Sequence, residues 1–475
     1  MMRNMMVSRR VVLSCAAITA GAMASGLSGC ASGAGGPKPL MDATSAMTGP
    51  KFWRFAPTPP MGWNSYDAYG ATVTEAQYLA NAEYQRAHLL PSGWQYCIID
   101  YLWFDPWQAT AHVKSNAPLE MDAFGRPQPA LNKFPSAEHG LGFAPLSKKI
   151  HAMGLKFGFH IMRGIPRRAV ELNTPIWNSH FHARDAANTH DTCNWNGDMY
   201  GVRGDTAAGR AWYNSLFQQY SREWEIDFIK VDDLSHPYHI FEIEAIRAAI
   251  NGTGRAIVFS TSPGRTAVAE GTNISHDANM WRISGDFWDN WAILNRHFDL
   301  VAAWHGFGGP GHWPDADMLP LGRLSIGNTS VGRQRWSNFT RDEQRTVMNL
   351  WSMAPSPLMM GGELISLDRW THGLLTNPEI IAINQDLRGA QGTRVARHGP
   401  LEIWTRPLHD DSLVIAAFNR GADHADAVVD FVSLGLQPQQ LVRDPWKRKT
   451  MGIVKTGMRM ELAPHASRLL RVWPA

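Results

Sequence analysis

The sequence predicts an α/β protein in which a (β/α)8 TIM barrel is followed by a C-terminal antiparallel β-sandwich domain. Three observations support this prediction. Short apolar runs alternate with longer amphipathic stretches over about 300 residues, as parallel strands and their connecting helices do. The apolar runs tend to end in polar residues, which favours a closed barrel with functional groups at one end of its strands. After residues 377–392 the helical stretches stop and alternating strands continue.

The individual elements follow from the periodicity of apolar residues. Barrel strands are expected at 95–100, 155–160, 224–232, 256–260 and 280–284, and helices at 74–87, 146–153, 209–224 and 238–250. Later strands are expected at 401–406, 412–418, 427–431 and 459–472, with turn signals such as Asp410-Asp411 between them. A glycine-rich dinucleotide fingerprint is missing after the first strand, which argues against a nucleotide-binding sheet. We therefore assign residues 51–388 to the barrel and residues 389–475 to the sandwich.

The N-terminal residues have the pattern of an export signal. Arg9 and Arg10 precede an apolar, small-residue run at 11–27, and together they predict a signal peptide of the twin-arginine type over residues 1–30. The segment ending at Cys30 also resembles a bacterial lipoprotein cleavage box, so Cys30 is a candidate lipid anchor; the alternative is a plain signal with a chance cysteine. Residues 31–50 are expected to be a flexible tether. The sequence therefore predicts an exported bacterial protein, either periplasmic or a membrane-anchored lipoprotein.

The composition is that of a globular enzyme. Hydrophobic residues make up 44% and charged residues 18%, and the net charge of +3 predicts no nucleic-acid partner. Beyond the export segment the cysteines are Cys97 and Cys193; a bridge is permitted, but Cys97 lies in an apolar run that predicts packing as a small hydrophobe. No Cys/His spacing resembles a metal site, so no metal and no organic cofactor are expected.

The predicted strand at 224–232 carries an unusual face. Its side chains alternate, so Phe228, Lys230 and Asp232 share one side of the strand. At the functional end of a barrel strand, a Lys two residues before an Asp is expected to keep that carboxylate ionised. An ionised, oriented carboxylate suits a nucleophile that attacks a sugar carbon. The alternative is a structural Lys–Asp ion pair at a strand end.

A retaining glycosidase needs a second carboxyl group as proton donor, held roughly 5 Å from the first. Asp286 is the candidate, because it follows the predicted strand at 280–284. Arg282 is expected to bind sugar hydroxyls or to hold the nucleophile in position. Asp289 is the competing carboxylate, and either one is also compatible with a helix N-cap.

The motifs PPMGWNSY, DFIKVD, MWRISGDFWDNW, HWPDADMLPLG and NPEIIAINQD occur in this order. Together they resemble the α-galactosidases (melibiases) of glycoside hydrolase family 27, from about Pro59 to the C-terminus. The resemblance implies a (β/α)8 barrel with a β-sandwich and double displacement with retention. It implies Asp232 as nucleophile and Asp286 as acid/base. It also implies sugar contacts from Trp63, Asp100, Lys230, Arg282 and Asp317, although Trp63 equally fits the core and Asp315 could share the role of Asp317.

The chain departs from the family pattern at the strand ends. Tyr101 fills the position of a second carboxylate that grips the 4- and 6-hydroxyl side of galactose in the family. His160 and Arg163 replace common residues of the third strand and are expected to reach the pocket, with a structural ion pair as the alternative for Arg163. These changes resemble plant members that also act on β-L-arabinopyranosides, sugars that match α-D-galactose without its hydroxymethyl group.

We therefore expect an exo-acting, retaining glycosidase that removes terminal α-D-galactosyl residues from galactoside or arabinoside oligosaccharides or polysaccharides. The alternatives are a β-L-arabinopyranosidase and a non-catalytic, carbohydrate-binding surface lipoprotein. A pocket relaxed around C6 accepts both sugars, because an unfilled slot discriminates weakly.

Overall fold

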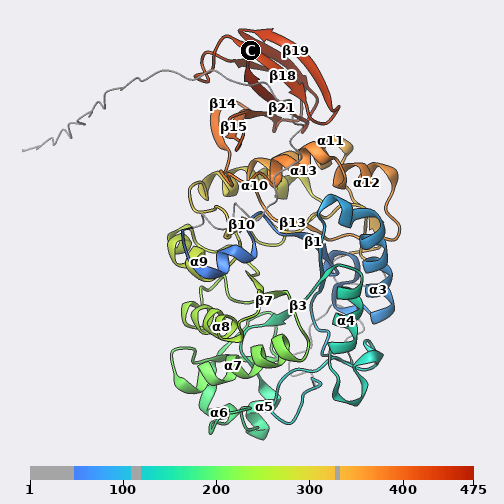
Figure 1. Cartoon of the computed structure of the whole chain (residues 1–475), viewed down its shortest axis with the longest axis vertical. Coiled ribbons are helices and arrows are strands. Elements are labelled where there is room, and N and C mark those ends of the chain that lie inside the picture. The colour runs from blue at the N-terminus through green and yellow to red at the C-terminus, as the bar shows by residue number, and fades with distance from the viewer. Residues whose placement is uncertain (1–47, 108–118, 327–331) are drawn as a thin grey trace, which may run out of the picture. The chain divides into compact units, whose positions relative to one another are not determined.

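The computed structural model describes residues 48–107, 119–326 and 332–475 (Figure 1). The predicted signal peptide, Cys30 and most of the tether lie outside these residues. No helix in the described ranges is both long and apolar enough to cross a membrane.

Eight parallel strands form the barrel wall, in the order β10–β9–β8–β7–β3–β2–β1–β13. They are β1 (Met61–Asn64), β2 (Tyr96–Ile99), β3 (Lys156–Met162), β7 (Phe228–Asp232), β8 (Val258–Thr261), β9 (Met280–Arg282), β10 (Trp313–Asp315) and β13 (Leu358–Met360). The two outer strands of this order meet beyond β10, where the Leu319 amide donates to the Met359 carbonyl at 2.7 Å and Gly361 donates back to Leu319 at 3.0 Å. The predicted TIM barrel is confirmed.

Helices surround this sheet in alternation with the strands (Figure 1). They are α2 (Tyr66–Tyr69), α3 (Glu75–Tyr84), α4 (Ala144–Ala152), α5 (Arg167–Leu172), α6 (Ala183–Ala186), α7 (Ala207–Arg222), α8 (Ile240–Thr253), α9 (Gly271–Asp277), α10 (Trp291–Ala303), α11 (Arg341–Met353), α12 (Arg369–Leu375) and α13 (Pro378–Asn384). Side-chain caps fix several starts; Thr340 and Glu343 form a reciprocal capping box at α11. The predicted helix at 74–87 ends its regular part at Tyr84 and continues as one wider turn to Leu89.

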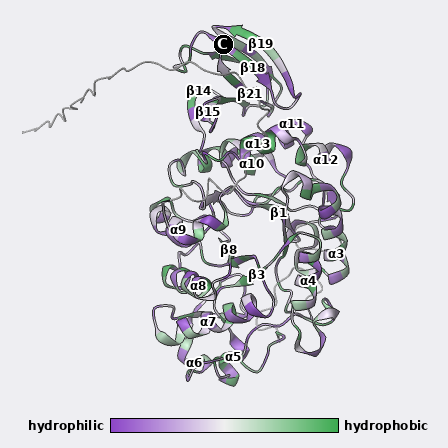
Figure 2. Cartoon of the chain, viewed as in Figure 1, coloured by the Kyte–Doolittle hydropathy of each residue, from purple (hydrophilic) through white to green (hydrophobic). Residues whose placement is uncertain are grey.

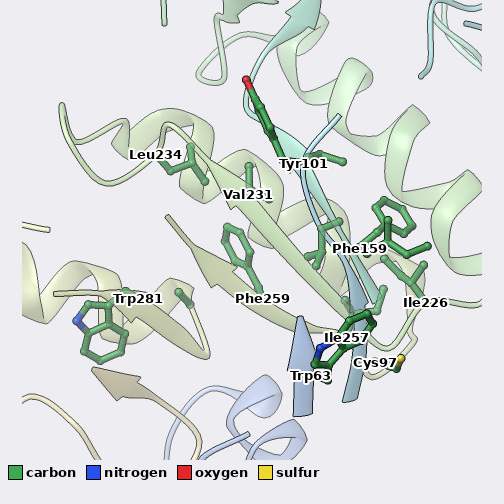
Figure 3. Packing of buried hydrophobic residues seen from close by; sticks show 14 of the residues in the cluster. Trp63, Cys97, Tyr101, Phe159, Ile226, Val231, Leu234, Ile257, Phe259 and Trp281 are labelled. Atoms are coloured by element: carbon green, nitrogen blue, oxygen red, sulfur yellow. The ribbon is translucent and has the colours of Figure 1, made fainter. Parts of the chain in front are cut away.

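Two layers of side chains pack on the two faces of the barrel strands. Phe228 belongs to an inner cluster with Tyr96, Val258 and Trp313. The side chains that alternate with these along each strand point to the outer helices. Val231 and Phe259 are examples, and both belong to the large outer cluster (Figure 3). Figure 2 shows hydrophobic and hydrophilic residues side by side on these helices, as expected of helices with one buried face. This alternation confirms that Phe228, Lys230 and Asp232 share the barrel's inner face.

An insertion that the sequence does not predict lies between β3 and α7. It forms a three-stranded sheet in the order β4–β6–β5, from β4 (Ile165–Pro166), β5 (Ala187–Thr192) and β6 (Met199–Val202). Strand β5 is mostly exposed and polar, so it lacks the apolar alternation that would have marked it as a strand. A smaller hairpin pairs β11 (Arg323–Leu324) with β12 (Arg335–Trp336).

The C-terminal domain is the predicted antiparallel β-sandwich. One sheet has the order β14–β15–β16–β21–β18–β19, and β17 pairs with β20 in the second. The strands are β14 (Thr393–His398), β15 (Leu401–Pro407), β16 (Leu413–Asn419), β17 (Ala425–Asp430), β18 (Gln439–Asp444), β19 (Lys449–Lys455), β20 (Gly457–Leu462) and β21 (Ser467–Pro474). The strand predicted at 459–472 is therefore two strands. Helix α11 contacts this domain, since Thr346 Oγ1 donates to Ser467 Oγ at 2.8 Å.

Both cysteines of the described chain are free and buried. Cys97 lies in the outer cluster, which confirms its predicted packing as a small hydrophobe. The permitted bridge between Cys97 and Cys193 is not formed.

Candidate active site

A cavity of about 430 Å³ opens at the C-terminal ends of the barrel strands. Tyr101, Asp286 and Asp317 follow β2, β9 and β10, whereas Asp232 is the last residue of β7. Parallel barrels carry their functional groups at this end. The lining residues include seven of the ten predicted site residues: Asp100, Tyr101, Lys230, Asp232, Arg282, Asp286 and Asp317.

Asp232 has the environment of an ionised carboxylate. Its Oδ2 lies 2.8 Å from Nε2 of the fully buried His160 on β3. Its Oδ1 is buried and makes no hydrogen bond within the described residues. Burial opposes ionisation, but His160 and Lys230 outweigh burial and hold the pKa of Asp232 well below its usual range. Ser262 also lies near this carboxylate and helps to lower its pKa. Asp232 therefore has one oxygen in contact with His160 and one oxygen without a close hydrogen-bond partner in the described chain.

Lys230 contacts a different carboxylate from the one expected. Its Nζ lies 3.0 Å from Oδ2 of Asp100, which also accepts a 2.7 Å hydrogen bond from Asn64. Burial opposes the charge on Lys230, but Asp100 and Asp232 raise its pKa above the usual range. Burial likewise opposes ionisation of Asp100, and Lys230 and His160 lower its pKa nevertheless. Lys230 thus keeps Asp232 ionised through space, while its direct partner is Asp100.

Asp286 lies at the open side of the cavity. Its side chain is 55% exposed, and its Oδ1 lies 3.1 Å from Arg282 Nη2. The same guanidinium nitrogen lies 2.8 Å from Asp317 Oδ2, which also accepts a 2.7 Å hydrogen bond from the Phe287 amide. Arg282 therefore fixes two carboxylates of the cavity, and the exposed Asp286 can exchange a proton with a leaving group or with water.

The two competing carboxylates lie elsewhere. Asp289 pairs with Arg335 at 2.6 Å and accepts the Asn338 amide at 2.8 Å, and it does not line the main cavity. Asp315 is buried beneath Asp317, whose amide donates to Asp315 Oδ1 at 2.9 Å. Burial and the charge of Asp317 raise the pKa of Asp315 to about 7.

One wall of the cavity is built jointly by β2 and the insertion. The Tyr101 hydroxyl accepts a 2.7 Å hydrogen bond from Asn196, which is fully buried in the β5–β6 connection. Trp195 lies beside Tyr101 with ring centroids 5.9 Å apart. Trp195 is 39% exposed and lines the cavity, so a flat apolar surface is presented next to the phenol.

Three predicted site residues do not line this cavity. His160 lies behind Asp232, as described above. Trp63 is fully buried in the outer cluster, and its indole N–H donates to the Gly362 carbonyl at 2.9 Å. Trp63 sits on the helix-facing side of β1, so the structure places it in the core, the alternative left open by the sequence.

Arg163 forms the structural ion cluster that was its alternative role. It is 3% exposed and lies within 2.9 Å of carboxylate oxygens of Asp233, Glu242 and Asp191. Its amide donates to the Asp232 carbonyl at 2.9 Å, and its Nε donates to the Asp233 carbonyl at 2.8 Å. Asp233 has a φ of +67°, a left-handed conformation that few non-glycine residues adopt. Arg163 thus holds two consecutive backbone carbonyls, those of Asp232 and Asp233, in place.

The same cluster has an arrangement that could hold a cation. Ligand atoms of Asp191, His239 and Glu242 lie within 4.8 Å of one another. The Arg163 guanidinium already contacts Asp191 and Glu242 and supplies the positive charge that these groups require. The group is therefore best described as an ion cluster around an arginine.

Several residues that the sequence does not identify as site residues also line the cavity, namely Tyr66, Asp67, Asn194, Trp195, His236 and Trp288. Tyr66 and Trp288 lie within the motifs PPMGWNSY and MWRISGDFWDNW, so their position beside predicted site residues was an available signal. Asn194 and Trp195 lie in an irregular connection with no periodicity, and only the three-dimensional fold brings them to the cavity.

The fold and the cavity define a class of protein: a barrel enzyme with paired carboxylates at a sugar-sized site. Comparison with known proteins refines it. A family model described as alpha galactosidase A matches residues 206–386, and one described as alpha galactosidase C-terminal beta sandwich domain matches residues 398–472. The alpha-galactosidase of Cyamopsis tetragonoloba is 28% identical over 428 residues, which cover 88% of this chain and 86% of the relative.

Solved structures agree. The GH27 β-L-arabinopyranosidase of Geobacillus stearothermophilus is 44% identical with a TM-score of 0.87, covering 89% of this chain and 98% of that one. A putative α-N-acetylgalactosaminidase of Bacillus halodurans is 41% identical with a TM-score of 0.78, covering 88% of this chain and 98% of that one. The chain belongs to glycoside hydrolase family 27, and it is a glycoside hydrolase.

Proposed function

We propose that this enzyme is a retaining exo-glycosidase that releases terminal β-L-arabinopyranosyl residues, and that α-D-galactosyl residues are its second substrate. The observation that carries the choice is the wall formed by Tyr101. Its hydroxyl is held by Asn196, so a fixed phenol takes the place of the carboxylate that grips the C6 side of galactose in the family. A sugar that lacks the hydroxymethyl group has no C6 hydroxyl to bind, so it loses no contact when a phenol replaces that carboxylate.

The comparisons support both substrates in different degrees. A β-L-arabinopyranosidase is 44% identical to this chain, and an Asp-to-Ala variant of that enzyme is known in complex with arabinose. The curated relatives named alpha-galactosidase from Cyamopsis, Arabidopsis and Oryza are 26–28% identical. The sequence alone ranked the galactoside first; the larger similarity and the Tyr101 wall favour the arabinoside.

The proposed reaction uses the two carboxylates in turn. Asp232 attacks the anomeric carbon through Oδ1 while Asp286 gives its proton to the departing glycosidic oxygen, so the glycosidic C–O bond breaks as an ester C–O bond forms. Asp286, now ionised, then takes a proton from water, and the water oxygen displaces Asp232 from the same carbon. Two inversions restore the original configuration.

The remaining cavity residues are proposed to hold the sugar. Asp100 and Lys230 form a charged pair that offers an acceptor and a donor to neighbouring hydroxyl groups. Arg282 and Asp317 form a second such pair on the opposite side. Because each group already has a charged partner, the hydroxyl binders are fixed before the sugar arrives, which lowers the cost of orienting it.

The test compares the rates of hydrolysis of p-nitrophenyl β-L-arabinopyranoside and p-nitrophenyl α-D-galactopyranoside. We expect a higher kcat/KM for the arabinoside, and a loss of more than about 10³-fold for both substrates in Asp232→Ala. A galactoside preference would overturn the substrate assignment and leave the mechanism intact. A folded wild-type enzyme that is inactive on both would overturn the proposed function.

Azide distinguishes the roles of the two carboxylates, because it attacks the anomeric carbon without the help of a general base. Asp286→Ala is expected to yield a glycosyl azide of retained configuration, because Asp232 still forms the ester. Asp232→Ala is expected to yield the inverted azide, because azide replaces the nucleophile. Proton NMR of the products distinguishes the two outcomes, and the reverse pattern would exchange the assignments.

A further inference from the structure

A second, smaller cavity lies where helix α11 contacts the β-sandwich. Its volume is about 130 Å³, and it is lined by Arg345 of α11 and by residues of the sandwich that include Asp444, Trp446, Lys447 and Arg468. A water molecule occupies about 30 Å³ of liquid volume, so this cavity has room for a few waters or one small polyatomic anion. A carboxylate attached to a sugar ring fits in such a space.

The cavity carries an excess of positive charge. Arg345, Lys447 and Arg468 face a single carboxylate, that of Asp444. That carboxylate lies 3.6 Å from Arg468 and 3.9 Å from Lys447, both longer than a close hydrogen-bonded pair. One anion therefore cannot neutralise all three cations, and the unbalanced charge favours an anionic ligand.

Arg345 is the distinctive member of this group. It is half-buried, with its Cζ 4.7 Å from the Trp370 ring and 6.0 Å from the Trp446 ring. Its side chain makes no ion pair within 4.0 Å and donates no hydrogen bond to any residue of the described chain, and its buried Nε has no partner. A guanidinium presents several donors in a planar fork that matches a carboxylate. Its terminal nitrogens are thus held in place by the two indoles without an acceptor.

The chemistry of the rim indicates what carries the anion. Trp446 lines the same cavity, and its indole N–H is fixed by Asn349 Oδ1 at 2.8 Å. Indole faces stack on the apolar faces of sugar rings. A carboxylate that is part of a sugar satisfies both features at once, whereas a free inorganic anion uses only the charge.

We propose that this cavity is a binding site for the carboxylate of a uronic acid residue, and that it holds acidic polysaccharide apart from the catalytic cavity. Arg345 and Arg468 bind the carboxylate, and Trp446 packs against the sugar ring. The proposal concerns binding alone, so it does not depend on which terminal sugar the catalytic cavity cleaves.

The test is calorimetric binding at low salt of cellobiouronate, a glucuronate linked to glucose, with its methyl ester and inorganic phosphate as comparison ligands. We expect the acid to bind at least about tenfold more tightly than its ester. This factor corresponds to one charge-assisted hydrogen bond, which the uncharged ester cannot form. Arg345→Gln is expected to weaken binding of the acid about tenfold or more. Arg341→Gln is the matched control, because Arg341 also stacks on Trp370, at 4.8 Å, but does not line the cavity.

Each other outcome contradicts the proposal. Equal affinity for the acid and its ester removes the role of charge, and equal affinity for phosphate removes the role of the sugar. Competitive inhibition of nitrophenyl arabinoside hydrolysis by cellobiouronate places its binding in the catalytic cavity. Should Arg345→Gln fail to fold, Arg468→Gln provides the same measurement, since the Arg468 side chain is 30% exposed and tolerates replacement.

Discussion

The two oxygens of the Asp232 carboxylate are not equivalent in this structure. Oδ2 is 2.8 Å from His160, whereas Oδ1 has no hydrogen-bond partner in the described chain. An oxygen that donates no electron density to a neighbour is the better nucleophile, so Oδ1 is the atom we expect to join the sugar. In the proposed mechanism Oδ2 is then expected to become the carbonyl oxygen of the ester, and His160 is expected to stabilise the carboxylate as it leaves.

This assignment predicts a specific result for His160→Phe. The variant keeps a ring at the position but loses the donor, so kcat/KM is expected to fall about 10- to 100-fold, the value of a hydrogen bond to a charged group. His160 and Lys230 together hold the pKa of Asp232 low, so the acid limb of the pH–rate profile is expected to move to higher pH.

The shift of the acid limb separates positioning from mere packing, because a packing defect lowers the rate at every pH. His160→Gln is the matched control, since its amide retains a donor and is expected to recover part of the rate. An acid limb that stays where it is in His160→Phe would show that His160 acts only by filling space.

At the scale of elements, the β4–β6–β5 insertion determines the shape of the sugar site. Its β5–β6 connection supplies Asn196 and Trp195, which hold and flank the phenol of Tyr101. The barrel alone thus provides the carboxylates of the cavity, and the insertion completes one wall. We infer that selectivity between arabinoside and galactoside resides in this contact.

Removing the contact is expected to relax the selectivity. In Asn196→Ala the Tyr101 hydroxyl loses its donor, and the phenol gains freedom to move away from the C6 side. The ratio of kcat/KM for the arabinoside over the galactoside is expected to fall about 3- to 10-fold, the value of one buried hydrogen bond. Asn194→Ala is the matched control, as Asn194 lines the same wall without a contact to the Tyr101 hydroxyl. Parallel losses on both substrates with an unchanged ratio would contradict this view.

These elements also show what the sequence could and could not predict. The alternation in 228–232 revealed the inner face of β7, because period-two alternation is a local property of the chain. The same rule misplaced the partner of Lys230, since contact with Asp100 depends on how β2 and β7 lie across the barrel. The motif containing Trp63 was found, but its side chain points to the helices; a motif does not specify which face of a short strand meets the cavity.

The insertion and the ion cluster around Arg163 could not be predicted from the sequence, because neither leaves a local pattern in the chain. The insertion strand β5 is polar and exposed, and the carboxylates that surround Arg163 come from three separate segments. Only the folded chain shows that Arg163 binds these carboxylates and fixes the backbone next to Asp232.

For the whole molecule, buried titratable groups couple stability to pH in opposing directions. Burial raises the pKa of Glu242 and of Asp315 to about 7, so the folded state holds more protons than the unfolded state between their ordinary values and pH 7. Stability from these two groups is present at low pH and is lost as the pH rises. Burial lowers the pKa of His239, His297 and His312 to about 4, and these residues favour the folded state as the pH rises. The pH dependence of the free energy of unfolding is the sum of these opposing contributions. The contribution of a single group must therefore be measured as the difference between the wild type and a variant that lacks the group.

Glu242→Gln provides that difference. The amide does not titrate, so the free energy of unfolding of the wild type relative to this variant is expected to decrease as the pH rises from 4.5 to 7. The raised pKa of Glu242 limits the decrease to about 3 kcal/mol, because one pKa unit corresponds to about 1.4 kcal/mol. Urea denaturation of both proteins across this pH range measures it. Glu244→Gln is the matched control for replacing a glutamate on the same helix, since Glu244 is exposed. A difference for Glu242→Gln that does not change with pH would show that Arg163 keeps Glu242 ionised at all these pH values, and that the ion cluster behind Asp232 is fully charged throughout.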